Sequence, residues 1–432
     1  MEDVLHSIIT EKRNGRSRGI PSFCTANGLV IEALLEQGKR YGCDVLIEAT
    51  ANQVNQFGGY TGMKPADFRD FVFGVADRVG FPREKLILGG DHLGPLTWAG
   101  LTEAEAMEKA RELVRMYVLA GYTKIHLDTS MRLGDDPENE VLRDETIARR
   151  GAVLYEECED AYKERLADNP AKHPVFIIGS EVPIPGGTQE AESSISVTKS
   201  EAVEKTLSAY HSEFNKRGLT RAFDHIIGIV VQPGVEFGDN DVFQYDRTAA
   251  AALCTTVRRH PGIVMEGHST DYQSPARLRE MVEDGISILK VGPALTFFMR
   301  EGLFALSMME KELIPKSERA DLIEALEQHM LADPSNWEKH YHGTESEITL
   351  KRKYSLSDRS RYYMANNEIQ KAIKRLFSNM NGIDVPMGML HQYLPRQYEK
   401  VRDGLLEKEA AALVRDCVAE LANDYYYAVG QK

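Results

Sequence analysis

Short apolar runs that stop abruptly at acidic or imidazole side chains recur along this chain. Residues 262–268 form one of them, Gly-Ile-Val-Met-Glu-Gly-His, and residues 86–92 form another that ends in Gly-Gly-Asp-His. Because side chains on a strand alternate between its two faces, Glu266 and His268 point to the same side. Runs of this kind predict buried parallel strands with polar groups at their carboxyl ends.

Eight such runs can be counted, and helical patterns separate them. Thr102 and Glu105 resemble a capping box that opens a helix running to Gly121. Alternating strands and helices predict a parallel sheet. The count of eight, with polar residues at nearly all of the strand ends, favours an α/β fold of the (β/α)8 TIM barrel type over an open doubly wound sheet. The predicted strands are residues 20–24, 44–49, 86–90, 124–127, 175–180, 226–231, 262–266 and 286–291.

The pattern changes near residue 316, where the strand signals stop and helical patterns take over. We therefore expect a barrel over residues 1–315 and a helical extension, residues 316–432, that packs on the barrel. The helices predicted in the extension are residues 317–331, 366–379 and 406–427.

The composition is that of a soluble globular protein, with 42% hydrophobic and 27% charged residues in 432. The net charge of −14 argues against nucleic acid or an anionic membrane as the main partner. No apolar run reaches the length of about 18 residues that a membrane span needs, and the N-terminus does not resemble a signal peptide. The five cysteines are scattered and form no Cys-x-x-Cys pair, which predicts a location in the reducing cytoplasm.

Acids and imidazoles at the strand ends are the candidates for chemistry. Asp91 beside His92 can supply a general base next to a metal ligand, or can satisfy local backbone groups instead. Glu266 and His268 are competent ligands for a divalent ion. Glu181 can act as a base, a ligand or a supporting acceptor. The sequence thus predicts Asp91 and Glu181 as catalytic residues, and His92, Glu266 and His268 as ligands of one divalent cation, zinc, manganese, cobalt or nickel.

Other strand ends offer groups for binding a substrate. Gln232 is a weak metal ligand and better suited to a substrate hydroxyl. His126 and Asp128 are also two residues apart, and we expect one of them to face the site. We assign Asp128 to substrate binding, whereas His126 is equally consistent with a satisfied core histidine.

Phosphate binding is expected near the eighth strand and the extension. Gly292 follows the eighth strand, where barrels often bind phosphate through backbone N–H groups. Arg359 and Arg361 could cap a phosphate from the extension, or form a salt-bridged surface turn. Lys290 is better explained as neutralising neighbouring acids than as a Schiff-base lysine. The sequence has neither a Gly-x-x-x-x-Gly-Lys-Ser/Thr loop nor a Gly-x-Gly-x-x-Gly motif after a strand, so no nucleotide cofactor is expected.

A set of long motifs, in order along nearly the whole chain, resembles one family. That family is the accessory, nominally non-catalytic subunit of D-tagatose-1,6-bisphosphate aldolase, related to the class II aldolases, and its members have also been labelled tagatose 6-phosphate kinases. The motifs that carry the resemblance are residues 19–22, 48–56, 58–63, 90–95, 126–131, 180–183, 232–237 and 266–273.

The resemblance implies a (β/α)8 barrel and a place in galactitol, N-acetylgalactosamine or tagatose catabolism. The related catalytic aldolases hold zinc with three histidines and use an aspartate as base, and Asp91 and His92 match that Asp-His pair. The other two histidine positions fall at Gln232 and at Glu266 or His268, which departs from the zinc-aldolase pattern. Some relatives look like metal-dependent 4-epimerases of ketohexoses.

Two functions follow from the resemblance. In the first, the chain stabilises a catalytic aldolase subunit as its partner and has a sugar or sugar-phosphate pocket at the carboxyl rim of its barrel. In the second, it is itself a metal-dependent 4-epimerase that acts on tagatose and fructose, or on their phosphates, by breaking and re-forming a carbon–carbon bond. An oligomer is expected in both cases. The sequence leaves open the choice between the two functions, whether the sugar is phosphorylated, and which metal is preferred.

Overall fold

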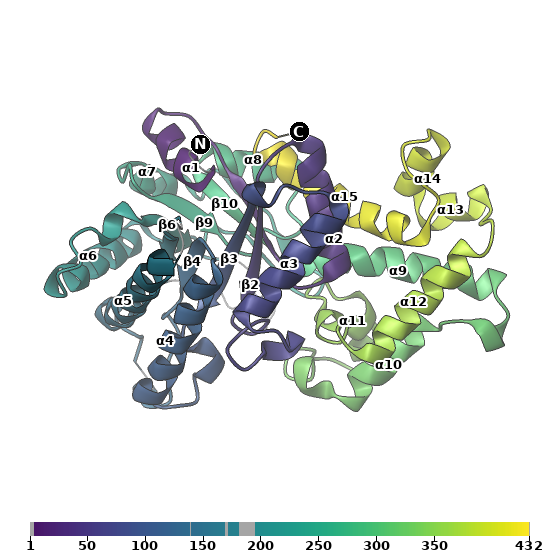
Figure 1. The fold of residues 1–432 in the computed structure, drawn as a ribbon, viewed down its shortest axis with the longest axis horizontal. Coiled ribbons are helices and arrows are strands. Elements are labelled where there is room, and N and C mark those ends of the chain that lie inside the picture. Colours follow the sequence, from purple (N-terminus) through teal and green to yellow (C-terminus); the bar gives the residue numbers. More distant parts are fainter. Residues whose placement is uncertain (1–3, 139, 169–171, 181–194, 432) are drawn as a thin grey trace.

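Eight parallel strands close into a barrel in this computed structural model, which describes residues 4–138, 140–168, 172–180 and 195–431 (Figure 1). Each strand pairs in parallel with both neighbours, and the last strand of the barrel pairs with the first. The predicted (β/α)8 fold is therefore confirmed. The strands are β1 (Ile20–Cys24), β2 (Val45–Thr50), β3 (Leu86–Leu93), β4 (Lys124–Leu127), β5 (Val175–Ile178), β6 (Ile226–Val231), β9 (Val264–Gly267) and β10 (Ile286–Val291). The hairpin strands β7 (Glu236–Phe237) and β8 (Val242–Phe243) lie outside the barrel.

A helix follows each barrel strand, as the alternating pattern predicts. The capping box of Thr102 and Glu105 is present at the start of helix α4 (Glu103–Ala120). There Glu105 N donates to Thr102 Oγ1, and Thr102 N donates to Glu105 Oε2. These helices are α2 (Gly28–Tyr41), α3 (Pro65–Val79), α4 (Glu103–Ala120), α5 (Asp144–Asp168), α6 (Ser200–Lys216), α7 (Ala251–Arg258), α8 (Pro275–Glu283) and α9 (Pro293–Leu313). None of the described helices is both long and apolar enough to cross a membrane.

The interior of the barrel has an aliphatic lower layer and a charged upper layer. Ile288 and Lys290 show the change on one strand: they are two residues apart, face the same side, and are both buried. Helix α1 (Val4–Arg13) contacts β6 and β9, and its Val4 and Leu5 join the aliphatic cluster. The amino end of the barrel is therefore closed by apolar packing, and the polar groups gather toward the carboxyl end.

The C-terminal region leaves the barrel along α9 and returns to it at the last helix (Figure 1). Its helices are α10 (Leu322–Ala332), α11 (Glu345–Tyr354), α12 (Asn367–Asn381), α13 (Met387–Tyr393), α14 (Pro395–Arg402) and α15 (Ala410–Ala428). The three predicted helices correspond to α10, α12 and α15, whereas α11, α13 and α14 were not predicted. Helix α15 packs on α2, α8 and α9, so the end of the chain covers the barrel wall. The division at residue 315 stays a prediction.

Candidate functional site

The end of β3 brings two consecutive side chains to the same space. The pairing of β3 with β4 shifts register between Gly90 and Leu93, and His92 adopts a φ of 47°, in the left-handed region. Such a conformation is costly for a residue with a side chain and is found mostly at functional sites. A side chain at Gly89 would overlap Glu48 Oε1 of the neighbouring strand, so the glycine leaves room for that carboxylate. The irregularity lets Asp91 and His92 act together, although they are adjacent in the sequence.

Four buried residues from three strand ends form one group: Asp91, His92, His126 and His268. One ligand atom from each lies within 4.8 Å of all the others. The ring centroids of His92 and His268 are 4.9 Å apart, and that of His126 is 5.1 Å from the first and 5.2 Å from the second. We call these four residues the Asp-His cluster.

The hydrogen bonds of the imidazoles suit a bound cation. His92 Nδ1 donates to Asp128 Oδ2 at 2.8 Å, and His268 Nε2 donates to Glu266 Oε1 at 2.9 Å. His126 Nδ1 contacts Asp91 Oδ1 at 2.9 Å, and its buried Nε2 has no hydrogen-bond partner among the described residues. Carboxylates that hold one imidazole nitrogen and leave the other for a metal are the usual surroundings of metal-binding histidines. The cluster therefore fits a divalent cation that takes nitrogen and oxygen ligands.

A layer of buried charges lies beneath the cluster, made of Glu48, Lys124, Glu266 and Lys290. Lys124 Nζ lies 2.7 Å from Glu48 Oε1 and 2.6 Å from Glu266 Oε2, and all three side chains are fully buried. Lys290 pairs with Glu48, and its Nζ lies 3.1 Å from Asp91 Oδ1. We call these four residues the charged layer. It supports the cluster from below because Glu266 also accepts the hydrogen bond of His268.

The charges around the cluster shift its ionisation. Burial would raise the pKa of Asp91, but His92 and the Lys290 ammonium outweigh burial and hold the pKa of this carboxyl well below its usual range. Burial lowers the pKa of His268 to about 3, although Glu266 accepts its hydrogen bond. The site therefore presents an ionised carboxylate beside a neutral imidazole at neutral pH.

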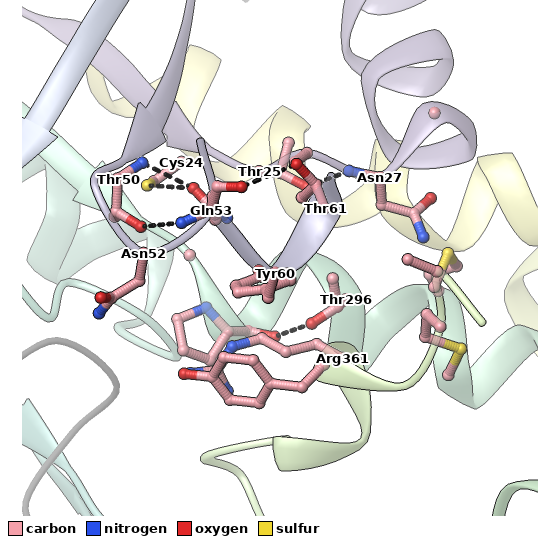
Figure 2. A pocket seen from close by; sticks show the side chains of 18 of the residues that line it. Cys24, Thr25, Asn27, Thr50, Asn52, Gln53, Tyr60, Thr61, Thr296 and Arg361 are labelled. Carbon is pink, nitrogen blue, oxygen red and sulfur yellow. Dashed lines mark hydrogen bonds between the residues drawn. The ribbon is translucent and has the colours of Figure 1, made fainter. Parts of the chain in front are cut away.

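A cavity of about 500 Å³ opens above the cluster, between the barrel and the extension. Asp91, His92 and His268 line it, together with Arg361 from the extension. Figure 2 shows Cys24 and Gln53 on one side of the cavity and Arg361 on the other. Its volume lies within the range of about 300–1,000 Å³ that is common for small-molecule sites. The carboxyl rim of the barrel therefore has a cavity that gives access to the cluster.

The extension places Arg361 at the cavity by means of a buried ion pair. Arg300 Nε of α9 lies 2.9 Å from Asp358 Oδ1, and Asp358 begins the short 3-10 helix η7 (Arg359–Tyr362). The Arg361 guanidinium stacks over the ring of Tyr362, 4.5 Å from its centroid, and the Tyr60 and Tyr362 ring centroids are 4.9 Å apart. The cavity is therefore a joint product of the barrel loops and the extension.

Comparison with known proteins identifies the family. The family described as D-tagatose-1,6-bisphosphate aldolase subunit GatZ/KbaZ-like matches residues 5–430. The chain belongs to this family. It is 44% identical over 423 residues to the D-tagatose-1,6-bisphosphate aldolase subunit GatZ of Salmonella newport (strain SL254), and equally to that of Salmonella agona (strain SL483), with 98% of each chain covered in both cases.

A solved structure resembles this GatZ/KbaZ-like chain along nearly its whole length. It is described as a probable tagatose 6 phosphate kinase from Sinorhizobium meliloti 1021. The identity is 44%, the TM-score is 0.86, and the match covers 95% of this chain and 100% of the other. The C-terminal extension is therefore shared with this relative, because the barrel by itself could not give that coverage.

Three of the residues predicted to bind a metal or to act in catalysis meet in the Asp-His cluster: Asp91, His92 and His268. Glu266 lies just below, with its carboxylate held by Lys124 and His268, so its assignment as a direct ligand stays a prediction and the geometry favours a supporting part. Glu181 lies outside the described residues.

The predicted substrate-binding residues divide into two groups. Gly292 and Arg361 line the cavity, and Asp128 orients His92 behind it. Gln232 instead accepts hydrogen bonds from Gly234 N and Val235 N, which closes a local turn. Arg359 donates to Asn336 O and does not line the cavity. Direct contacts of all five residues with a substrate stay predictions.

Two parts of the site were missed or left open by the sequence. The structure places His126 in the cluster, whereas the sequence was equally consistent with a satisfied core histidine. Lys124 and Glu48 were not singled out, although each is a lone charge at an apolar run that becomes a barrel strand. A charge in such a run is a usable signal, because lysine and glutamate are almost never fully buried unless they are paired.

Gly94 gives a test of how tightly the site is packed. An added Cβ there would overlap the backbone carbonyl oxygen of Asp128, whose side chain orients His92. We expect Gly94→Ala to reduce the free energy of unfolding by about 1–3 kcal/mol, the usual cost of overpacking, and to weaken cation binding. Gly100→Ala is the matched control, since nothing lies within 4 Å of an added Cβ at Gly100. Equal melting temperatures for the two variants would contradict the expectation.

Proposed function

We propose that this GatZ/KbaZ-like chain is a metal-dependent enzyme that binds a ketohexose or ketohexose phosphate and epimerises its C4 centre by breaking and re-forming the C3–C4 bond. The observation that carries the proposal is the Asp-His cluster, in which three imidazoles and a carboxylate meet and of which Asp91, His92 and His268 line a cavity. Although Gln232 stands where the related aldolases have a histidine, His126 on β4 lies beside His92 and His268, so three imidazoles are available to a cation. This arrangement of metal-ligand and base side chains supports the proposal.

Each part of the cluster has a place in this reaction. A divalent cation held by His92, His126 and His268 would polarise the C2 carbonyl and the neighbouring hydroxyl of the sugar. Asp91 takes the proton of the C4 hydroxyl, the C3–C4 electron pair moves into an enediolate of C1–C3, and C4 becomes an aldehyde. The aldehyde group then rotates to present its other face. The enediolate attacks this face, and Asp91 returns the proton to the C4 oxygen. The sugar leaves with C4 inverted and with no net loss or gain of atoms or electrons.

Asp91→Asn tests the part of the general base. We expect the rate of tagatose–fructose interconversion to fall by about 10²–10⁴-fold, the usual contribution of a positioned base. The assay uses the purified chain with Mn²⁺, Co²⁺, Ni²⁺ or Zn²⁺. It follows interconversion of tagatose and fructose, both as free sugars and as their monophosphates, and triose release from tagatose 1,6-bisphosphate. Asp160→Asn, at an exposed pair with Lys163, should leave the rate unchanged. Absence of both activities with every metal would rule out the enzyme function.

The second candidate function is that of a subunit that stabilises a catalytic aldolase. The Salmonella relatives favour it, since both are described as aldolase subunits. Under this function we expect the chain to assemble in the cytoplasm with a catalytic class II aldolase and to raise that partner's activity or melting temperature on co-expression. The same experiment with the Asp91→Asn chain separates the candidates, because stabilisation of a partner does not require the base.

A kinase function is not proposed. The relative from Sinorhizobium meliloti is described as a probable tagatose 6 phosphate kinase, but this sequence has no Gly-x-x-x-x-Gly-Lys-Ser/Thr loop to hold the phosphates of a nucleotide.

A further inference from the structure

The start of α9 is occupied by a carboxylate of the chain itself. Asp271, in the loop after β9, accepts hydrogen bonds through Oδ1 from Gly292 N at 3.1 Å and from Ala294 N at 2.8 Å. These two groups follow the eighth barrel strand, where (β/α)8 barrels commonly bind a phosphate at a helix start. Thr296 is engaged as well, since its hydroxyl donates to Asp358 Oδ2. The donors that a phosphate would use at this position are thus satisfied within the fold.

Lys290 and Arg361, two cations that line the cavity, differ in whether carboxylates of the chain already neutralise their charge. Lys290 is surrounded by Glu48, Asp91 and Glu266. Arg361 has no described carboxylate within ion-pair distance: its guanidinium donates to the carbonyl oxygens of Ser357 and Asp358 and to the Tyr362 hydroxyl. Its positive charge therefore remains available to an anion in the cavity.

A second cation from the extension lines the same cavity. Lys374 of α12 also lines the cavity, and it makes no hydrogen bond or ion pair with another described residue. Both cations come from the extension and neither from the barrel. The available positive charge of the cavity is thus supplied by the extension.

We propose that this site recognises one phosphate group of a ketohexose, through Arg361 and Lys374 under the extension, and that Asp271 excludes a second phosphate from the start of α9. The proposal rests on the proposed function, whose substrate it defines as a ketohexose monophosphate, neither the free sugar nor a bisphosphate. Guanidinium groups bind phosphate through charge-assisted hydrogen bonds, which are stronger than neutral ones.

The environment of Asp271 agrees with its proposed role of excluding a second phosphate from the start of α9. Burial raises the pKa of this carboxyl to about 6, although the N–H groups of Ala294 and Gly292 oppose the rise. Above that pH the carboxylate is charged, so a phosphate near the start of α9 would meet both occupied donors and a like charge.

Binding to the metal-loaded full-length chain tests the proposal without turnover. Calorimetry is run with D-tagatose, its 1-phosphate, its 6-phosphate and its 1,6-bisphosphate. We expect one monophosphate to bind at least about tenfold more tightly than the free sugar, equivalent to about 1.4 kcal/mol, and the bisphosphate to gain nothing further. A bisphosphate that binds about tenfold more tightly than the better monophosphate, or two monophosphates that bind no better than tagatose, would overturn the proposal.

Variants of the full-length chain locate the two effects. Arg361→Met should reduce the preference for the monophosphate to less than about threefold, and Arg361→Lys, which keeps the charge, should retain part of it. Arg375→Met removes a charge from the same helix as Lys374 but not from the cavity lining, and should leave the preference for the monophosphate unchanged. Asp271→Ala should increase the affinity for the bisphosphate relative to the monophosphate. An unchanged preference in Arg361→Met with an intact melting curve would contradict the assignment.

The result also separates this proposal from the proposed function. If tagatose binds and is epimerised but phosphate brings no gain in affinity, the recognition by Arg361 is wrong and the function stands. If no ketohexose binds in any form, both are wrong.

Discussion

Replacing His126 with alanine is expected to abolish the divalent-cation binding that we propose for this chain. The Nε2 atom of His126 is buried without a hydrogen-bond partner among the described residues and belongs to the Asp-His cluster. Losing a residue that merely orients a metal ligand typically reduces metal affinity by about 10–100-fold, so loss of a ligand should cost more than about 100-fold. The metal content of the purified variant and chelator competition measure the change.

The alternative role of His126, as a core histidine, gives a different result. In that case the variant would lose stability, through the small void and the broken contact with Asp91, but would keep its cation. His260→Ala is the control, because His260 pairs with Glu204 and lies outside the cluster. A His126→Ala chain that is less stable and yet binds zinc with wild-type affinity would show that the core role is the correct one.

Replacing Lys124 with methionine is expected to cost about 3–5 kcal/mol in the free energy of unfolding, the usual result of removing one partner from a buried ion pair. Lys124 is fully buried between Glu48 and Glu266, and the charged layer would keep two carboxylates with Lys290 as their one remaining cation among the described residues. Urea unfolding followed by circular dichroism measures the change. Cation binding should weaken as well, because Glu266 orients His268.

Two further variants show whether the loss comes from the unpaired charge. Lys163→Met breaks an exposed pair with Asp160 and should change the free energy of unfolding by less than about 1 kcal/mol, the usual limit for surface pairs. Adding Glu48→Gln to Lys124→Met removes one of the excess negative charges and should restore part of the stability. If Lys124→Met proved as mild as Lys163→Met, the charged layer would not support the barrel.

The sequence predicted the barrel because its signals are local. Each strand is a short apolar run, and Thr102 with Glu105 marks a helix start that the structure contains. Helices α13 and α14 were not predicted, since each is under nine residues long and their place in the fold depends on the neighbours they pack against. The position of α15 against α2 and α8 could not be predicted either, because those contacts join distant parts of the chain.

The candidate site likewise has residues that the sequence indicated and one that it left open. The sequence marked Asp91, His92 and His268 as candidates because each stands where an apolar run ends, which is a property of the nearby sequence. Whether His126 joined them depended on the register between β3 and β4, which shifts at the point where His92 takes its left-handed conformation. A shift of one residue reverses the face to which a strand's side chains point, so this outcome is set by strand pairing.

The sequence by itself determined which residues stand at the carboxyl ends of the barrel strands, because apolar runs and the polar residues that end them are local features. Tertiary structure decided which of them meet. Closure of the barrel brings Lys124 of β4 between Glu48 of β2 and Glu266 of β9, and the extension turns Arg361 toward a cavity that the barrel could not form without it. These contacts depend on strand register and on packing between distant segments, and neither is encoded in the order of a few neighbouring residues.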